Sequence, residues 1–327
     1  MKSRIFPKAG RSISEVGFGA WAIGGSWGEV SDSDAKAALT AALDAGIDFI
    51  DTADVYGDGR SEQLIAQVLR GRSERPFVAT KAGRRLSPHV AGGYTLANLT
   101  SFVERSLRNL QTDCLDLVQL HCPPTEVYYM AEVFDAMDRL AQAGKLRHYG
   151  VSVEKVEEAI KAIEFPNVAS VQIIYNIFRQ RPADVFFPMA AARGVAVIAR
   201  VPLASGLLTG KMTPATQFAA DDHRAFNRHG EAFDKGETFA GVPYDLALQA
   251  VDMLRQYLPD GVAMAPYALR WILMETAVTT VIPGAKTAAQ AQMNAQASAL
   301  PPVPAEVMAA LREIYTQHIA PHVHHAW

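Results

Sequence analysis

The stretch GIDFIDTADVYG, residues 46–57, joins an apolar strand-like run to a polar loop. Phe49 and Ile50 end abruptly in Asp51, and Tyr56 follows five residues later in a segment rich in glycine and aspartate. In buried parallel sheets, polar side chains gather at the carboxyl ends of the strands, where barrel and open-sheet enzymes hold their chemistry. We therefore interpret residues 46–57 as a strand end and loop that carry function.

Strand-like runs of this kind alternate with helical patterns along the whole chain. The helical pattern is clear in SDAKAALTAALDAG, which opens with a Ser/Asp cap and closes at Gly46, and in TLANLTSFVERSLRNLQ, which opens at Thr95. Eight strands alternating with helices predict a (β/α)8 TIM barrel rather than a doubly wound sheet. We expect one barrel domain over residues 1–327. The eight expected strands are 16–19, 47–51, 77–81, 115–121, 148–152, 170–175, 195–201 and 279–283.

Segments outside this alternation predict the two ends of the barrel. Residues 4–6 and 12–14, separated by Pro7-Lys8-Ala9-Gly10, fit a small hairpin that plugs the bottom. Residues 82–94 and 203–242 are too long for plain turns, and they follow strands, so we expect them at the carboxyl face with the tail from Pro301 onward. Substrate specificity in such barrels lies in these loops, so the sequence does not identify the substrate.

Composition and charge narrow the class of protein. The chain has 327 residues, 49% of them hydrophobic and 20% charged, and a formal net charge of -3 with no basic block, which argues against nucleic acid or an anionic membrane as partner. No stretch approaches the roughly 18 apolar residues of a membrane span, and MKSRIFPKAG lacks a signal-peptide core. We expect a cytoplasmic protein with a small-molecule substrate.

Cysteine and histidine give no metal spacing. Cys114 and Cys122 form no CxxC pair, and we expect both to be core thiols. The tail is rich in histidine, but nothing fixes the geometry of these side chains, so we expect a solvated, disordered tail and no metal site. The histidines of the tail are His318, His322, His324 and His325.

Four polar residues fall at or just past three neighbouring strand ends. They are Asp51, Tyr56, Lys81 and His121. A lysine that closes an apolar strand is costly to bury alone, and Asp51 is its natural partner. An ammonium beside Tyr56 favours the phenolate and is expected to lower the pKa of the phenol toward the range of a general acid. Next to it, His121 can hydrogen-bond a carbonyl oxygen.

The motifs GIDFIDTADVYG, ATKAG, DLVQLH, HYGVS, PLASGLLTGK and VIPGAKTAAQAQMN, in this order, resemble the aldo-keto reductase superfamily. The resemblance runs from about Val16 to Asn294. It implies a (β/α)8 barrel that binds NADP(H) without a Rossmann domain. It also implies that Tyr56 donates the proton, that Lys81 paired with Asp51 tunes it, that His121 orients the substrate oxygen, and that hydride comes from C4 of the nicotinamide.

The resemblance also implies the nicotinamide site. Ser152 and Gln172 match positions that hold the carboxamide, although Val153 stands where the family often has asparagine. Arg200 replaces an aromatic residue that stacks on the ring; its planar guanidinium could stack, but its positive charge would disfavour the oxidised ring. Trp21 matches a position that lines the substrate pocket, and an edge-of-core tryptophan is an equal alternative.

The phosphate and adenine sites follow in the same way. Backbone amides in PLASGLLTGK match the pyrophosphate-binding loop, since free N–H groups suit phosphate oxygens. Lys286, near a helix start, is suited to a 2′-phosphate, so NADP(H) is preferred over NAD(H). The loop residues are Leu203, Ser205 and Leu207 with Lys211 nearby, and the 2′-phosphate and adenine segment contains Gly284, Lys286, Gln290 and Asn294.

Two functions of different classes stay open. The first is an NADP(H)-dependent oxidoreductase, of EC 1.1.1 type, that acts on an aldehyde, ketone or sugar carbonyl or on the corresponding alcohol. The second is a regulatory subunit of the same fold that binds the cofactor with little turnover, like the channel-associated β subunits. A metal-dependent isomerase or hydrolase is disfavoured because the sequence has no carboxylate cluster or HxH spacing.

Overall fold

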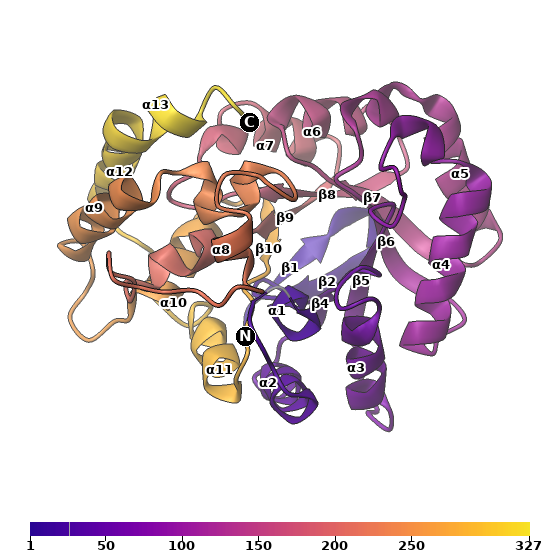
Figure 1. Ribbon diagram of the computed structural model, residues 1–327, viewed down its shortest axis with the longest axis horizontal. Coiled ribbons are helices and arrows are strands. Elements are labelled where there is room, and N and C mark those ends of the chain that lie inside the picture. Colours follow the sequence, from indigo (N-terminus) through magenta and orange to yellow (C-terminus); the bar gives the residue numbers. More distant parts are fainter. Residues whose placement is uncertain (26) are drawn as a thin grey trace.

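The computed structural model describes residues 1–25 and 27–327, and its centre is a barrel of eight parallel strands (Figure 1). The strands follow one another around the sheet in chain order from β3 to β10. Parallel bridges from Val16 to Val281 and from Gly19 to Gly284 close the ring between its first and last strands. The predicted (β/α)8 barrel is confirmed. Its strands are β3 Phe18–Gly19, β4 Phe49–Asp51, β5 Phe77–Ala82, β6 Leu115–His121, β7 Leu146–Ser152, β8 Val168–Ile174, β9 Ala196–Arg200 and β10 Val278–Val281.

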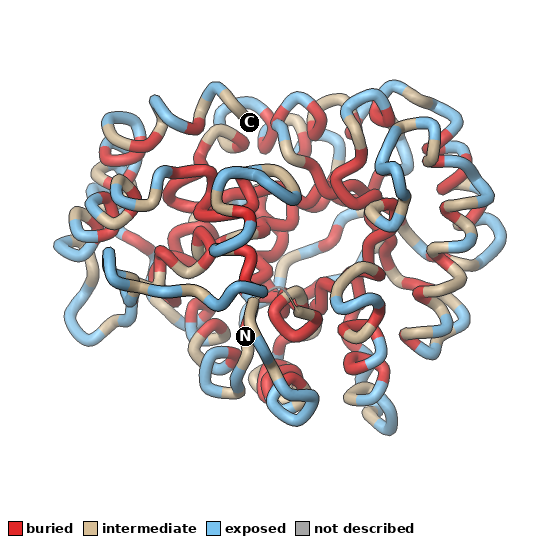
Figure 2. Tube along the Cα trace, in the orientation of Figure 1, coloured by how far each residue is buried: buried red, intermediate tan, exposed pale blue. Residues whose placement is uncertain are grey.

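Helices surround the strands, which are buried at the centre while the outer helix faces are exposed (Figure 2). The Thr95 side chain accepts a hydrogen bond from the Asn98 N–H and caps α4, as predicted, whereas α2 begins at Asp32 under a Ser31 cap, slightly before the expected start. The helices are α1 Trp21–Gly24, α2 Asp32–Asp44, α3 Arg60–Leu69, α4 Leu96–Leu110, α5 Ala131–Gln142, α6 Val156–Ala162, α7 Phe186–Ala192, α8 His223–Phe226, α9 Tyr244–Arg255, α10 Met264–Leu273, α11 Ala288–Gln296, α12 Ala305–Ile314 and α13 Ala320–Val323.

An antiparallel hairpin of β1 (Ser3–Phe6) and β2 (Arg11–Ser14) closes the amino-terminal end of the barrel. Phe6 and Ile13 are fully buried in a cluster with Phe49 and Phe77, which begin strands β4 and β5. The expected plug is therefore present, and the opposite, carboxyl end is left for the site.

The histidine-rich tail is ordered, so the expectation of a disordered tail was wrong. It forms α12, a π-helical turn (Tyr315–Ile319) and α13, and it buries Ile319 and Val323 completely. Trp327 then packs under the Arg179 guanidinium at 4.0 Å, and its indole N–H donates to Asp234 at 2.9 Å. The expectation considered only the histidines. The apolar residues between them supply the packing that orders the segment.

The long connection between β9 and α9 also has its own structure. It contains the 3-10 turns η5 (Ala204–Thr209), η6 (Lys235–Glu237) and η7 (Phe239–Gly241), together with α8. In residues 1–25 and 27–327, no helix combines the length and apolar character needed to cross a membrane.

Candidate active site

A buried ion pair joins the carboxyl ends of β4 and β5. Lys81 is 1% exposed, and its Nζ lies 2.5 Å from Asp51 Oδ2 and donates to the Thr52 carbonyl at 2.9 Å. Burial is the largest single effect and lowers the pKa of Lys81, but the charges and hydrogen bonds of Asp51 and Tyr56 together outweigh it, and the pKa is raised. Lys81 therefore carries a positive charge that is held in place by Asp51, and removing either partner would leave an uncompensated buried charge.

Tyr56 reaches this ion pair from the loop after β4. Its hydroxyl accepts a hydrogen bond from Lys81 Nζ at 3.2 Å, and the ammonium also lies 4.9 Å from the centre of its ring. The loop can approach α1 this closely because Gly24 has no side chain; a Cβ there would lie 2.6 Å from Tyr56 Cβ.

The expected lowering of the Tyr56 pKa was wrong. Burial raises the pKa of Tyr56, and the opposing effect of Lys81 does not overcome it. The phenol therefore keeps its proton at neutral pH, in contact with a cation that can stabilise the phenolate once the proton leaves.

His121 completes the group at the end of β6. Its ring meets that of Tyr56 edge-on, with 5.9 Å between ring centres and 85° between planes. Burial, and then the positive charges of Arg84, Lys81 and Arg200, lower the pKa of His121 well below its usual range. The imidazole is therefore neutral, and its buried Nδ1 has no hydrogen-bond partner among the described residues. A neutral imidazole can donate one N–H to a substrate oxygen.

Two glutamines, Gln119 and Gln172, hold the carboxylate of Asp51 in place. Gln119 and Gln172 both donate to Asp51 Oδ1, at 3.1 and 2.6 Å, and Gln172 also donates to Gln119 at 3.2 Å. Gln172 was predicted to hold the cofactor, and in the structure its amide fixes Asp51. Gln119 was missed, although it lies two residues before His121 and the alternation of a strand places both on one face.

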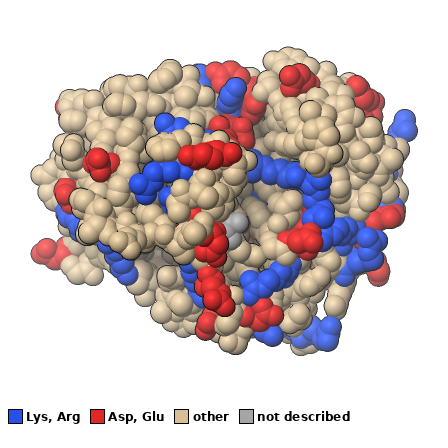
Figure 3. Space-filling view, in the orientation of Figure 1, with Lys and Arg blue, Asp and Glu red and all other residues tan. Residues whose placement is uncertain are grey.

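One cavity of about 880 Å³ connects these residues with the predicted cofactor residues. It opens among acidic and basic side chains near the middle of the face in Figure 3. Two predicted residues, Lys81 and Leu207, are buried and do not line it; Lys81 acts on the cavity through Tyr56 and Asp51, which do. The predicted residues on the wall are Trp21, Asp51, Tyr56, His121, Ser152, Gln172, Arg200, Leu203, Ser205, Lys211, Gly284, Lys286, Gln290 and Asn294.

Trp21 lies against the proposed acid. Its ring stacks on Tyr56, with 6.0 Å between centres and 18° between planes, and it meets Trp27 edge-on at 5.4 Å. Trp27 was not predicted. The two tryptophans give the catalytic end of the cavity an apolar wall, which suits a carbonyl carbon skeleton more than a bare polar ligand.

The loop after β9 has the backbone expected of a phosphate cradle. Val201, Ala204 and Ser205 have φ values of 50°, 46° and 55°, and Gly206 has 97°. Left-handed residues in such a turn direct neighbouring N–H groups into one concavity, where they can bind an anion. Lys211 lies on the wall near this loop and adds a positive charge.

The segment before α11 lies on the cavity wall beside Trp27. Lys286 Nζ donates to the Trp27 carbonyl, and burial followed by the charge of Arg224 lowers the pKa of Lys286. Gln290 accepts from the Lys286 backbone N–H at 2.7 Å, and Asn294 donates to the Gly284 carbonyl at 3.1 Å. Both side chains thus shape the loop that presents Lys286.

A second cation beside Trp27 was missed. Arg224, from α8, lines the cavity, and its guanidinium pairs with Asp222 at 2.6 Å and covers the Trp27 ring at 4.9 Å. Nothing in the local sequence separates Arg224 from other arginines of the long connection, because its place depends on how that connection folds back over the barrel.

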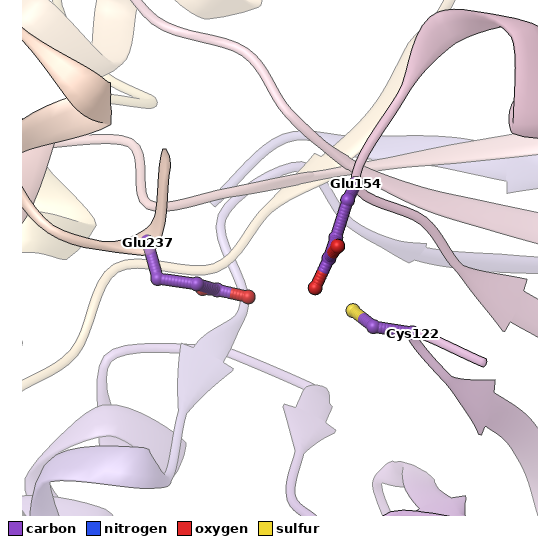
Figure 4. Close-up of side chains that lie close together, drawn as sticks. All are labelled: Cys122, Glu154 and Glu237. Atoms are coloured by element: carbon purple, nitrogen blue, oxygen red, sulfur yellow. The ribbon is translucent and has the colours of Figure 1, made fainter. Parts of the chain in front are cut away.

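Charged residues around Cys122 form a compact network. Figure 4 shows Cys122, Glu154 and Glu237 pointing toward one another, and their ligand atoms lie within 4.8 Å of each other. Two arginines supply the positive charge here: Arg200 lies 2.5 Å from Glu237, and Arg84 lies 3.1 Å from Glu154. The two carboxylates, Glu154 and Glu237, are therefore held in ion pairs with arginines, which the sequence did not predict.

The geometry agrees with the comparisons with known proteins. The Aldo/keto reductase family model matches residues 15–316. The aldo-keto reductase YhdN of Bacillus subtilis is 32% identical over 86% of this chain and 84% of its own length, and the aldo-keto reductase yakc [NADP(+)] of Schizosaccharomyces pombe is 26% identical over 84% and 81%. The solved glycerol dehydrogenase AKR11B4 from Gluconobacter oxydans has a TM-score of 0.80 at 29% identity, covering 97% of this chain and 96% of that one. The chain therefore belongs to the aldo/keto reductase family of oxidoreductases.

Proposed function

We propose that the protein reduces an aldehyde, ketone or sugar carbonyl to the alcohol with NADPH, or runs the reverse reaction with NADP⁺. The observation that carries this proposal is the contact of Tyr56 with Lys81, which is itself paired with Asp51, on the wall of a cavity. A protonated phenol beside a fixed ammonium is a proton donor whose conjugate base is stabilised in advance.

Each residue of the site has a separate role in the reduction of a bound carbonyl. The hydride for the carbonyl carbon would come from NADPH when it is bound. Tyr56 donates its proton to the carbonyl oxygen as negative charge develops there, and Lys81 stabilises the phenolate that results. His121, neutral through burial and nearby positive charge, donates an N–H to the same oxygen and orients it. The two tryptophans hold the carbon skeleton and exclude water.

The shape and the donors of the cavity fit a dinucleotide. The cavity wall combines Tyr56 and His121 with the left-handed turn after β9 and with Lys286. Ser152 would hold the nicotinamide end, the turn would hold the pyrophosphate, and Lys286 would hold a 2′-phosphate. A relative whose name specifies NADP(+) adds support for NADP(H) over NAD(H).

Steady-state oxidation of NADPH by the purified chain with a panel of aldehydes, ketones and sugars tests the proposal. We expect carbonyl-dependent loss of NADPH absorbance with at least one member, and slower loss with NADH. Tight binding of NADPH with no turnover of any member, nor of NADP⁺ with the matching alcohols, would instead favour a regulatory subunit.

A further inference from the structure

Arg200 is locked at the carboxyl end of β9. Its guanidinium lies 2.5 Å from a Glu237 oxygen, donates to the Val153 carbonyl at 2.8 Å, and approaches Cys122 Sγ at 3.7 Å. Burial is the largest single effect and lowers the pKa of Arg200, but Glu237 together with the other acidic groups nearby outweighs burial, and the net shift is upward. The group is therefore cationic at every accessible pH and has little freedom to turn away.

This cation lies beside the proposed nicotinamide site. Strand register places Ser152 opposite Gln172 on β7 and β8, and Arg200 opposite Ile174 on β8 and β9. Arg200 reaches across to Val153, the residue directly after Ser152, and it lines the same cavity as Ser152 and Gln172. A dinucleotide bound through Ser152 would therefore have its nicotinamide close to the guanidinium.

Such a charge discriminates between the two redox states of the cofactor. The ring of NADP⁺ carries a positive charge and that of NADPH does not, so an uncompensated guanidinium repels only the oxidised form. An oxidoreductase that releases NADP⁺ gains from some repulsion, but one that must also bind NADP⁺ needs the charge to be balanced.

Glu237 supplies that balance. It is 6% exposed at the end of η6, and it pairs with Arg200 and, at 3.9 Å, with Arg84. Burial raises the pKa of its carboxyl, but the two arginines outweigh burial and the net shift is downward, so the group stays ionised. Arg84 lies closer to Glu154, whose pKa is raised to about 7, mainly by burial. Above that pH, Glu154 is ionised and balances Arg84, which leaves Glu237 as the counter-ion of Arg200.

We propose that Glu237 is a positioning residue for the cofactor: it holds Arg200 against the nicotinamide site and cancels its charge, so that the oxidised and reduced forms bind with similar affinity. This inference rests on the proposed NADP(H) dependence. It also explains how arginine can occupy the place of an aromatic platform, since a guanidinium paired with a carboxylate offers a flat face and the pair carries no net charge.

Separate titrations of NADP⁺ and NADPH, followed by calorimetry, test the inference without any turnover. In Glu237→Gln the ratio of Kd for NADP⁺ to Kd for NADPH should rise about tenfold or more, because a unit charge at close range in a buried site has an effect of that size. In Arg200→Met the ratio should fall, because Glu237 is then left to attract the oxidised ring. The double variant Arg200→Met/Glu237→Gln should return toward the wild-type ratio.

If Glu237 had a purely structural role, Glu237→Gln would weaken the binding of NADP⁺ and NADPH alike. The ratio of their Kd values would then not change in opposite directions in Glu237→Gln and Arg200→Met. Glu157→Gln is the matched control, because it removes one carboxylate of an exposed ion pair with Arg181 and should leave the ratio unchanged. A ratio within threefold of wild type in both single variants would overturn the inference. If the wild-type chain bound neither dinucleotide, the proposed function itself would fail, which is a distinct result.

Discussion

The two sides of the cavity are built in different ways. On the side of β4, β5 and β6, the reactive residues are strand ends or lie one short loop away, and they contact one another directly, as the pair Lys81–Asp51 does at 2.5 Å. On the side of β9, the strand-end residue Arg200 is completed by Glu237, which belongs to the long connection before α9. The barrel itself fixes the first side, whereas the fold of a loop fixes the second.

The largest effect is expected on the barrel side. Tyr56→Phe should lower kcat on the order of 10²-fold or more, because it removes the proton donor and little else, while Kd for NADPH stays nearly unchanged. Tyr129→Phe, an exposed tyrosine at 68% exposure, is the control and should have no effect. If Tyr56→Phe kept activity within a few-fold of wild type, Tyr56 would not be the proton donor, and the side of β4, β5 and β6 would not be the catalytic side.

Lys81→Met should reduce kcat comparably, and raising the pH should not restore it, since the lost cation stabilises the phenolate in the transition state. The variant leaves Asp51 buried without its counter-ion, so the free energy of unfolding should also fall, by about 3–5 kcal/mol. Adding Asp51→Asn should recover much of that stability in urea unfolding but not the activity. Full recovery of activity at high pH would show that Lys81 only assists deprotonation.

The positions of these proposed catalytic residues could be predicted from the sequence because each is tied to a strand end. The apolar runs locate Asp51, Lys81 and His121 within the barrel, and the loop after Asp51 is too short to carry Tyr56 far. Arg84, Arg224 and Glu237 could not be predicted in this way, because each lies in a loop whose path depends on packing against distant segments. Glu237, for example, follows Asp234, which accepts the indole N–H of Trp327.

The sequence also did not predict the pKa of Tyr56 or the ordered structure of the tail. The lysine beside Tyr56 was visible, but the extent of burial that raises the tyrosine pKa was not. The histidines of the tail suggested a solvated segment, although the residues between them pack on the barrel. In both cases the deciding quantity was the exclusion of water, which depends on the complete fold.

On the loop side, the expected effects are smaller and depend on charge. Lys286→Ala should weaken NADPH binding by roughly tenfold to a hundredfold and leave NADH almost untouched, because a charge-assisted contact with a 2′-phosphate is lost. The difference should shrink as the salt concentration rises. Lys161→Ala, which removes a surface lysine paired with Glu164, is the control. Equal affinity of the wild type for NADPH and NADH in fluorescence titrations would contradict the assignment.

The smallest effect concerns stability beneath the catalytic loop. Asp54 is fully buried, neither carboxylate oxygen has a partner among the described residues, and burial followed by the charge of Glu62 raises its pKa to about 7. The folded chain therefore holds a proton that the unfolded chain releases near pH 4, so stability falls as the pH rises from about 4 to about 7. Asp54→Asn should lack this fall and gain roughly 1–3 kcal/mol over wild type at pH 8 relative to pH 4.

Urea unfolding at several pH values measures this difference. Asp58→Asn is a control of opposite sign, because a hydrogen bond from Arg85 lowers the pKa of Asp58, and the stability that it contributes is lost only as the pH falls through that lowered pKa. If Asp54→Asn paralleled wild type across the range, the carboxyl would be ionised or hydrated in the folded chain.

Transfer of label from the cofactor to the product tests the central claim most directly. The purified chain is incubated with NADPH that carries deuterium at the transferable C4 position, together with the aldehyde that supports the fastest NADPH oxidation, and the alcohol is analysed by mass spectrometry. We predict one deuterium at the former carbonyl carbon for each NADPH consumed, and almost none with Tyr56→Phe over the same time. Alcohol formed without the label, or formed equally fast by Tyr56→Phe, would contradict hydride transfer at this site with Tyr56 as the acid.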